Sequence, residues 1–448
     1  MELRSRITDL MPRARSELAE LVAFRSVADA RLFPAVECER AANWVAKRFS
    51  ELGFYDARLE PTADGSHAVV GSRECADPNA PTVLLYAHYD VQPPLDDAAW
   101  RTPPFELSEV DDRWYGRGAA DCKGNILMHL TALRALGPDI PVNLKLIVEG
   151  SEEQGTGGLE AFVPEHAGLL RADAILVCDT GNAAAGRPAV TVSLRGMVNV
   201  LVTVEALPAE LHSGMFGGPA PDALKALIAM LATLHDREGN LTVRGLPSDQ
   251  IWLGEPYSRG QFRRDAGIAD GVGLLGSGAV ADMLWARPAL TVLGIDAPPA
   301  LGGAAAIPAR VTARLNLRIP AGVDPLPARN LLAAHLHAAA PWGVAVNIET
   351  EASGAAFRAV TGGPAYQAIA EAMREAYGTA MTTLGQGGSI PLCDVLATTY
   401  PHAEIILMGV EDPLSAIHAP NESVSPAELA TMALTEALFL QRFARLAR

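Results

Sequence analysis

Positive charge is in short supply in this chain of 448 residues, which has 36 Lys and Arg against 52 Asp and Glu and a formal charge of −16. Phosphate backbones and anionic lipid repel a protein of this charge, and the sequence holds no cluster of Lys and Arg that would reverse the effect locally. We therefore expect no nucleic acid among its partners.

Cysteines are few, and long apolar runs are missing. The five cysteines are scattered, odd in number and never spaced C-x-x-C, which excludes a disulfide framework and a zinc knuckle. No apolar run approaches the roughly 18 residues of a membrane span. The N-terminal segment, MELRSRITDLMPRARSELAELVAF, spreads its apolar residues at helical spacing among charges, unlike a signal peptide. These absences predict a cytoplasmic protein without membrane attachment.

Apolar residues, by contrast, are plentiful: they make up 49% of the sequence, enough for a large core in two or three domains. Apolar runs at 82–87, 142–148 and 174–178 predict buried parallel strands, and helical patterns at 38–52 and 125–136 alternate with them. This pattern indicates an α/β fold with a mainly parallel central sheet flanked by helices. Ligands of such sheets collect beyond the carboxyl ends of the strands.

The pattern changes near residue 190 and changes back near residue 356. Between these points, strands and amphipathic helices predict a smaller α+β domain, with elements at 198–204, 221–235, 311–319, 326–339 and 344–348. The α/β pattern then resumes, with elements at 364–377, 404–408 and 426–446. The late elements need a sheet to pack on, so we expect one discontinuous domain, 1–188 and 356–448, interrupted by an inserted domain at 189–355.

The segment YAHYDVQP places His88 and Asp90 at the end of the first apolar strand. If the strand continues, residues two apart share one face, and Asp90 can accept the second ring N–H of His88. That contact would fix the tautomer that a metal ligand needs. A strand-end histidine beside a solvated aspartate is the alternative for this tripeptide.

Asp121, in GRGAADCKGN, lies in a glycine-flanked loop before a predicted helix. Its two carboxylate oxygens can bridge two cations, which an imidazole or an amide cannot do. An N-cap is the commoner role of an aspartate in this place. Asp121 therefore indicates a bridging metal ligand only in combination with other candidate ligands.

A pair of acids, Glu152 and Glu153 in VEGSEEQGTGG, directly follows the apolar run NLKLIV. Adjacent residues of an extended segment point to opposite sides, so we expect one to bind metal and the other to face the bound water as general base. Two unpaired carboxylates at a strand end would repel each other, and a cation removes that repulsion. A solvated acidic turn is the alternative.

Asp179 in LVCDTGN ends another strand, and His418 in AIHAPNE precedes the last helix. With His88, Asp121 and Glu153 they complete a ligand set for two metal ions that share Asp121. Each ion then has one imidazole, one private carboxylate and the bridge, and a position stays open for water, as in catalytic zinc sites. Mixed nitrogen and oxygen ligands suit Zn²⁺, Co²⁺ or Mn²⁺.

At this point the chain resembles a known family. H-x-D at a strand end, D-x-K-G before a helix, a strand-terminal E-E, C-D-T and a late H-A-P-N-E occur in the order and approximate spacing of the M20 metallopeptidases, over nearly the whole chain. ELHSGMFGG, IPARVTARLNLRIP and GQGGSIP look like the carnosinase-like dipeptidase branch. Each motif alone is weak, whereas the ordered set is specific.

The resemblance implies which ligands belong together. His88 and Asp179 would hold one ion, Glu153 and His418 would hold the other, and Asp121 would bridge them.

The resemblance also implies roles for the neighbours of these ligands. Glu152 would be the general base, and Asp90 would orient His88. A cis peptide bond would join Asp121 to Cys122.

Further implied roles fall on the inserted domain and on the GQGGSIP segment. His212 would cross the interface of a homodimer and stabilise the tetrahedral oxyanion, which makes the inserted domain a lid and dimerisation domain. Arg318 and Ser389 would bind the free carboxylate of the substrate, for which an Arg fork is suited. The alternatives are a turn-capping His212 and a solvated strand-end Arg318.

We therefore expect a homodimeric enzyme with two divalent cations, zinc first, that hydrolyses dipeptides or short peptides with a free C-terminal carboxylate. An N-acyl amino acid deacylase would use the same metal site and differ only in its acyl pocket. A binding protein that has lost catalysis is the alternative from another class. The complete set of ligands counts against it, because a retired site has no need to neutralise so many carboxylates.

Overall fold

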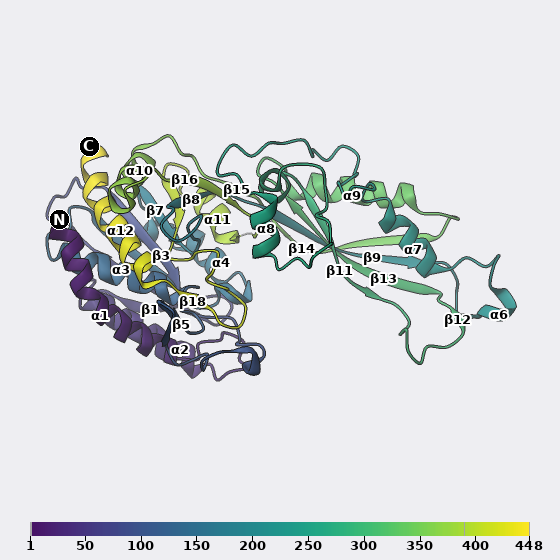
Figure 1. Cartoon of the computed structure of the whole chain (residues 1–448), viewed down its shortest axis with the longest axis horizontal. Helices are drawn as coiled ribbons and strands as arrows, with labels where there is room; N and C mark the ends of the chain where they lie inside the picture. Colours follow the sequence, from purple (N-terminus) through teal and green to yellow (C-terminus); the bar gives the residue numbers. More distant parts are fainter. Residues whose placement is uncertain (1, 389, 448) are drawn as a thin grey trace. The chain divides into compact units, whose positions relative to one another are not determined.

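The structure, a computed structural model, describes residues 2–388 and 390–447. The chain folds as two compact units (Figure 1). The first unit contains Met1–Val192, Ala359–Leu384 and Pro391–Arg448, and the second contains Ser193–Arg358 and Gly385–Ile390. None of the described helices is both long and apolar enough to cross a membrane.

The central sheet of the first unit is built on parallel strands, with antiparallel strands added at both sides. In sheet order the strands are β1 (Arg58–Pro61), β2 (His67–Arg73), β6 (Asn143–Glu149), β3 (Thr82–His88), β7 (Ala174–Cys178), β17 (Glu404–Met408) and β8 (Ala189–Leu194). β6, β3, β7 and β17 run parallel, whereas β2 and β8 are antiparallel to their neighbours. The short β15 (Phe357–Arg358) and β16 (Thr382–Gln386) pair with β8.

Helices cover this sheet, and the predicted α/β class is confirmed. They are α1 (Glu2–Ala23), α2 (Val36–Ser50), α3 (Lys123–Leu136), α4 (Gly158–Glu165), α5 (Ala167–Leu170), α10 (Pro364–Tyr377), α11 (Pro391–Thr399) and α12 (Pro426–Leu446). Val83 and Leu85 of β3 share one core with α1, α2, α3, α10 and α12. Leu84 and Tyr86 alternate with them and are buried too, so β3 is covered on both faces.

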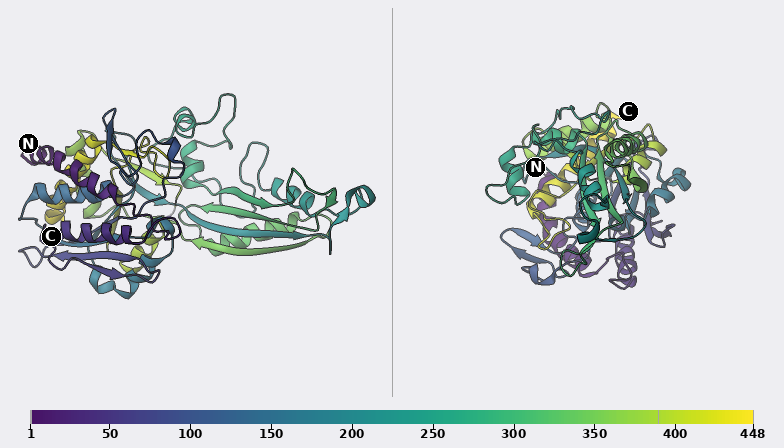
Figure 2. Two further views of the ribbon diagram at one scale, coloured as in Figure 1. Left: turned by 90° about the horizontal axis from the view of Figure 1, so that it is seen from below. Right: turned by 90° about the vertical axis from the view of Figure 1, so that its right-hand side faces the viewer.

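The two ends of the chain meet in the first unit. α1 and α12, the first and last helices, pack against each other (Figures 1 and 2). A small three-stranded sheet is formed by β18 (Ser423–Val424), β5 (Arg113–Tyr115) and β4 (Ser108–Val110). It ties the segment before α12 to the segment before α3.

The second unit is an α+β structure. Its antiparallel sheet has the order β11 (Ala289–Asp296), β13 (Arg310–Ile319), β9 (Gly196–Glu205) and β14 (Ala345–Gly354). Val198, Val200 and Val202 point to one face, where they share a core with α7 (Ala223–Ala232) and α9 (Pro325–Ala339). The remaining elements are β10 (Leu211–His212), β12 (Ala306–Ile307), α6 (Ser213–Phe216), α8 (Arg259–Asp265) and the π-helix η3 (Asp282–Ala286).

Candidate metal centre

The predicted site residues of the early chain lie where neighbouring strands end. His88 is the last residue of β3, and Asp179 directly follows β7. Glu152 and Glu153 come three and four residues after the end of β6. Because β3 lies between β6 and β7 in a parallel arrangement, these segments leave the sheet at the same edge.

Asp121 lies between two imidazoles. Its Oδ1 is 2.9 Å from Nε2 of His88, and its Oδ2 is 3.0 Å from Nε2 of His418. Nε2 of His88 is also 3.1 Å from Oδ1 of Asp179, and Nε2 of His418 is 3.2 Å from Oε2 of Glu153. The five predicted ligands therefore converge in two groups that share Asp121.

The loop that carries Asp121 is held by the carboxylate of Glu422, which is fully buried. Its Oε1 accepts hydrogen bonds from the backbone N–H of Asp121 and of the residue before it, both at 3.0 Å. Its Oε2 accepts from the backbone N–H of Gly118 at 2.9 Å and from Nη1 of Arg117 at 2.8 Å. Glu422 lies four residues after His418, so one short segment supplies a ligand and anchors another.

Glycine is required at position 118 of this loop. Gly118 has a φ of 82°, in the left-handed region that side chains disfavour. A Cβ atom there would also lie 2.5 Å from Cγ1 of Val91. The glycine before Asp121 therefore allows the loop to adopt its conformation.

The peptide bond between Asp121 and Cys122 is cis, as the family resemblance led us to expect. Cys122 is fully buried, and its Sγ donates a hydrogen bond to the carbonyl oxygen of Cys178 at 2.9 Å. Burial raises the pKa of the Cys122 thiol. A protonated thiol is a poor metal ligand, although Cys122 lies close to His88 and Asp179.

Asp90 contacts both His88 and the acidic pair. The shared face of His88 and Asp90 depended on the strand continuing to Asp90, and β3 ends at His88. Nδ1 of His88 is 3.0 Å from the main-chain oxygen of Asp90 and 3.4 Å from its carboxylate. A donated Nδ1–H leaves the lone pair of Nε2 for a metal. The Asp90 carboxylate accepts the backbone N–H groups of Glu152 at 3.2 Å and Glu153 at 3.1 Å.

The acidic pair forms a 3₁₀ turn over Glu152–Gln154, so our expectation of an extended segment was wrong. The Glu153 side chain is only 2% exposed, and Gln92 donates to it through its backbone N–H at 3.2 Å and its side-chain amide at 2.8 Å. No described residue forms a hydrogen bond or ion pair with the Glu152 carboxylate. The two acids therefore differ in their hydrogen-bond partners, and this difference does not come from the alternation of a strand.

Negative charge is concentrated around Asp121. Burial and the charge of Asp179 raise the pKa of Glu152 well above its usual value. Glu411, after β17, is 7% exposed, and burial together with Asp121 and Asp179 raises its pKa as well. Oxygens of Asp121, Asp179 and Glu411 lie within 4.8 Å of one another. Glu411 was missed in the sequence, although an acid just after a buried parallel strand is a usable signal.

The donors of this site fit a pair of divalent cations. Hydrogen bonds to Asp121 and Glu153 raise the pKa of His418 to about 11, and the same carboxylates would attract a cation. The His418 side chain is 55% exposed, so this side of the site is open to solvent. Mixed imidazole and carboxylate donors suit Zn²⁺, Co²⁺ or Mn²⁺. Buried acids in this number need such a compensating charge.

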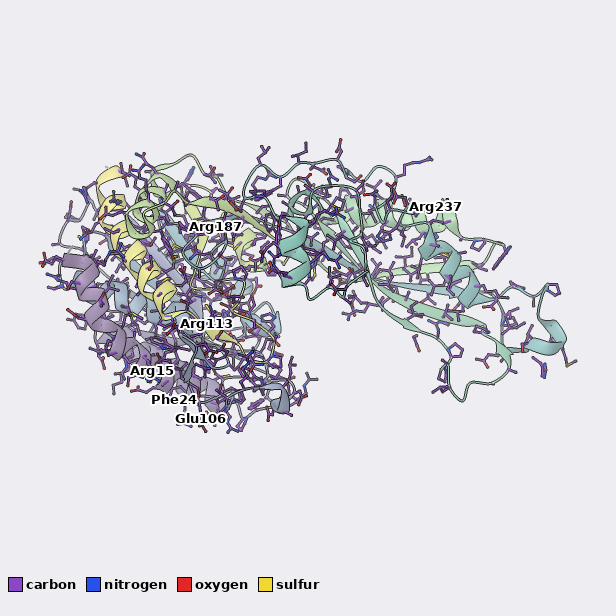
Figure 3. The ribbon with its side chains drawn as sticks, in the orientation of Figure 1. Arg15, Phe24, Glu106, Arg113, Arg187 and Arg237 are labelled. Carbon is purple, nitrogen blue, oxygen red and sulfur yellow. The ribbon has the colours of Figure 1, made fainter. Side chains whose placement is uncertain are left out.

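Arg113 braces the segment that leads to His418 (Figure 3). It extends from β5 and donates to Oδ2 of Asp412 at 2.8 Å and to Oγ of Ser423 at 2.8 Å. Asp412 and Ser423, which lie before and after His418 in the sequence, are therefore tied to the small three-stranded sheet.

The other predicted site residues belong to the second unit. His212 is exposed at the end of β10, and its Nδ1 accepts the backbone N–H of Gly214 at 3.1 Å, so the capping role is present. This bond places the ring proton on Nε2, which is left as a donor. Arg318 is half-buried on β13, and its guanidinium has no hydrogen-bond or ion-pair partner among the described residues. Ser389 lies outside the described residues.

A family comparison agrees with this geometry. The family model described as Peptidase family M20/M25/M40 matches residues 84–442 of the chain, which include all five predicted ligands. This chain belongs to that family.

Comparison with similar proteins shows which kind of M20 peptidase this chain resembles. It is 41% identical over 415 residues to the cysteinylglycine-S-conjugate dipeptidase of Corynebacterium striatum, covering 91% of this chain and 90% of that protein. It is 32% identical over 349 residues to a Cys-Gly metallodipeptidase of Schizosaccharomyces pombe, covering 72% of each. The crystal structure of human carnosine dipeptidase 1 matches with a TM-score of 0.81 and 25% identity, over 99% of this chain and 98% of that one. This M20 peptidase is accordingly an enzyme of the dipeptidase type.

Proposed function

We propose that this enzyme hydrolyses dipeptides, or short peptides with a free C-terminal carboxylate, at a site for two divalent cations. Zinc is the first expectation, and cobalt or manganese is the alternative. The observation that carries the proposal is Asp121, which directs one oxygen to His88 and the other to His418. His88 and Asp179 would hold one cation, and Glu153 and His418 would hold the other.

Glu152 is the proposed general base. Two cations in this site would polarise the scissile carbonyl and lower the pKa of a water molecule from 15.7 toward about 7. The Glu152 carboxylate has no partner among the described residues, so it is available to take the proton of that water and return it to the leaving amine. Its raised pKa suits a group that both accepts and donates a proton. Asp90 holds Glu152 through its backbone N–H and orients His88.

We propose a homodimer formed through the inserted domain, which we place at 189–355 between the catalytic segments 1–188 and 356–448. β11 is an edge strand of its sheet, and Val292, Leu293 and Ile295 on it are 42%, 49% and 44% exposed. An apolar edge of this kind favours pairing with a second chain. His212 of one chain would donate from Nε2 to the oxyanion formed in the other.

Arg318 and Ser389 are the proposed binding groups for the substrate carboxylate. The guanidinium of Arg318 has no partner among the described residues, so it is available for such a ligand, and the fork of Arg suits a carboxylate. The substrates named for the relatives, Cys-Gly conjugates and β-Ala-His, are the first candidates. We also propose a cytoplasmic location, which the five unpaired cysteines support.

A substrate panel on metal-reconstituted protein tests the function. We expect release of the C-terminal residue from dipeptides and little release from N-acetyl or N-succinyl amino acids. Preference for the N-acyl amino acids would assign the enzyme to the deacylases, which would use the same metal site. Failure to hydrolyse either class, with both cations bound, would contradict the proposal and favour a binding protein.

A further inference from the structure

Arg195 is a buried cation that the protein leaves largely without partners. It directly precedes β9 in the second unit and is 7% exposed. Its backbone N–H donates to the carbonyl oxygen of Gln386 at 3.1 Å. Its Nε and Nη1 atoms are buried and have no hydrogen-bond partner in the described chain.

The charge that acts on Arg195 has the same sign. Burial, and then the positive charge of Arg318, lower the pKa of Arg195 to about 10. No carboxylate contributes to this shift, in a chain with 52 acidic residues and a formal charge of −16. A buried cation without a counterion is costly for the folded state. Among the described residues no acid pairs with the guanidinium of Arg195 or of Arg318, which marks a place for an anion.

Gly387 allows the guanidinium of Arg195 to lie close against the backbone. A Cβ atom at position 387 would lie 2.8 Å from Nη2 of Arg195, which is closer than a side chain tolerates. The backbone of Gly387 does not have a positive φ, so its conformation does not require glycine. The missing side chain therefore matters for space.

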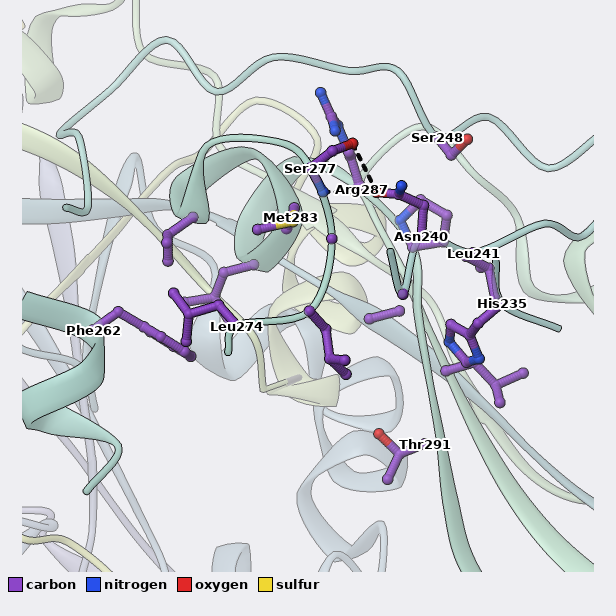
Figure 4. A pocket seen from close by; sticks show the side chains of 18 of the residues that line it. His235, Asn240, Leu241, Ser248, Phe262, Leu274, Ser277, Met283, Arg287 and Thr291 are labelled. Carbon is purple, nitrogen blue, oxygen red and sulfur yellow. Dashed lines mark hydrogen bonds between the residues drawn. The ribbon is translucent and has the colours of Figure 1, made fainter. Parts of the chain in front are cut away.

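Arg195 also lines a cavity of about 740 Å³ within the second unit (Figure 4). Apolar side chains, including Phe262, Leu274 and Met283, make up much of its wall. A second arginine of the wall, Arg287, has partners: Asp282 at 3.6 Å and the carbonyl oxygen of Gln250 at 2.9 Å. The apolar wall strengthens the attraction of Arg195 for an anion, because few dipoles or waters compete with it.

We propose that Arg195 and Arg318 together bind the C-terminal carboxylate of the substrate, with Arg195 as a second guanidinium of this subsite. The inference rests on the proposed function and extends it to a residue outside the predicted site. Gly387 allows the guanidinium to keep its place against the backbone, and the cavity beside Arg195 leaves room for the residue that bears the carboxylate.

The test compares each dipeptide with its C-terminal amide. We expect the wild-type enzyme to prefer the acid, and Arg195→Gln to reduce kcat/KM for the acid about ten- to a hundred-fold, mainly through KM, while the amide is almost unaffected. Arg195→Lys should recover part of the preference. Arg314→Gln is the matched control, because Arg314 is an exposed arginine of β13 that pairs with Glu351 at 2.7 Å.

Two measurements that do not depend on turnover complete the test. The Tm of Arg195→Gln should equal or exceed that of the wild type, because the variant removes an uncompensated buried charge. Calorimetric binding of a dipeptide to Glu152→Gln should weaken by a similar factor when Arg195→Gln is added. Unchanged acid preference and unchanged binding in Arg195→Gln would overturn the inference, as would a lower Tm with parallel losses for acid and amide. A wild-type enzyme that binds dipeptides through Arg195 without hydrolysing them would refute the proposed function and leave this subsite standing.

Discussion

Glu422 accepts the backbone N–H of Asp121 at 3.0 Å, across 301 residues of sequence. The same carboxylate binds Arg117 at 2.8 Å, and it lies four residues after His418. One buried acid thus fixes the distance between two proposed metal ligands that come from opposite ends of the chain.

This relationship predicts the behaviour of Glu422→Gln. The amide keeps the shape but has one acceptor oxygen for donors that now use two, and it leaves Arg117 buried without a counterion. We expect a loss of about 3–5 kcal/mol in the free energy of unfolding and a fall of about ten- to a hundred-fold in metal affinity, measured by Co²⁺ titration. Glu404→Gln is the control, because Glu404 accepts the backbone N–H groups of Ala365 and Tyr366 at the start of α10. It should lower stability and leave metal affinity unchanged. Equal metal affinity in both variants would contradict the positioning role of Glu422.

Glu152 and Glu153 should respond differently to the same substitution. Glu152→Gln should reduce kcat by about 10²- to 10⁴-fold while two metal ions per chain remain, because only the proton acceptor is lost. Glu153→Gln should lose one ion per chain, because this carboxylate contacts His418. Metal analysis by mass spectrometry beside a kinetic assay distinguishes them. Loss of metal in Glu152→Gln would mean that the two roles are exchanged.

Removal of metal should destabilise the first unit. Each cation bound at a hundred times its Kd adds about 2.7 kcal/mol to the stability of the folded state, so a chelator should lower the Tm and added Zn²⁺ should restore it. Asp121→Asn should show a much smaller response, because an amide cannot bridge two cations. Differential scanning calorimetry measures both. An equal response to zinc in the variant would argue against Asp121 as the shared ligand.

The variant His212→Ala tests whether His212 of one chain acts at the active site of the other chain in a dimer. Loss of a donor to the oxyanion should cost about 3 kcal/mol in kcat/KM. Mixed with inactive Glu152→Gln protein, the variant should regain activity, because each hybrid dimer has one site with both groups intact. Native mass spectrometry of the mixture, with one of the two proteins isotopically labelled, confirms that hybrid dimers form. A mixture of proven dimers that stays inactive would show that His212 acts within its own chain.

The elements were predictable where the apolar pattern was strong. The strand at 404–408 and the helices at 364–377 and 426–446 are observed as β17, α10 and α12 with the same bounds. Burial of one face or both faces of a helix or strand produces a recognisable pattern of apolar residues in its sequence. The stretch at 253–306 lacks such a pattern, and the structure forms it from α8, the π-helix at Asp282–Ala286, the edge strand β11 and loops.

The proposed ligands stand out in the sequence because each follows a strand or precedes a helix in a short polar motif. Glu422, Gln92 and Arg195 lacked such a signal. The partners of Glu422 are mostly backbone N–H groups of a distant loop, and every residue type offers that group. For Arg195 the telling feature is that no described carboxylate pairs with its guanidinium, which only the folded chain reveals. The turn at Glu152 was missed because the apolar run before it suggested a longer strand.

The amino-acid sequence by itself determined the α/β class, the order of the elements and the residue types able to bind two cations, because these follow from periodicity and local chemistry. Only the tertiary structure decided which oxygen of Asp121 faces which imidazole, which acid anchors its loop and which arginine lacks a partner. Those relations depend on distances between segments hundreds of residues apart, and packing of the whole chain sets such distances.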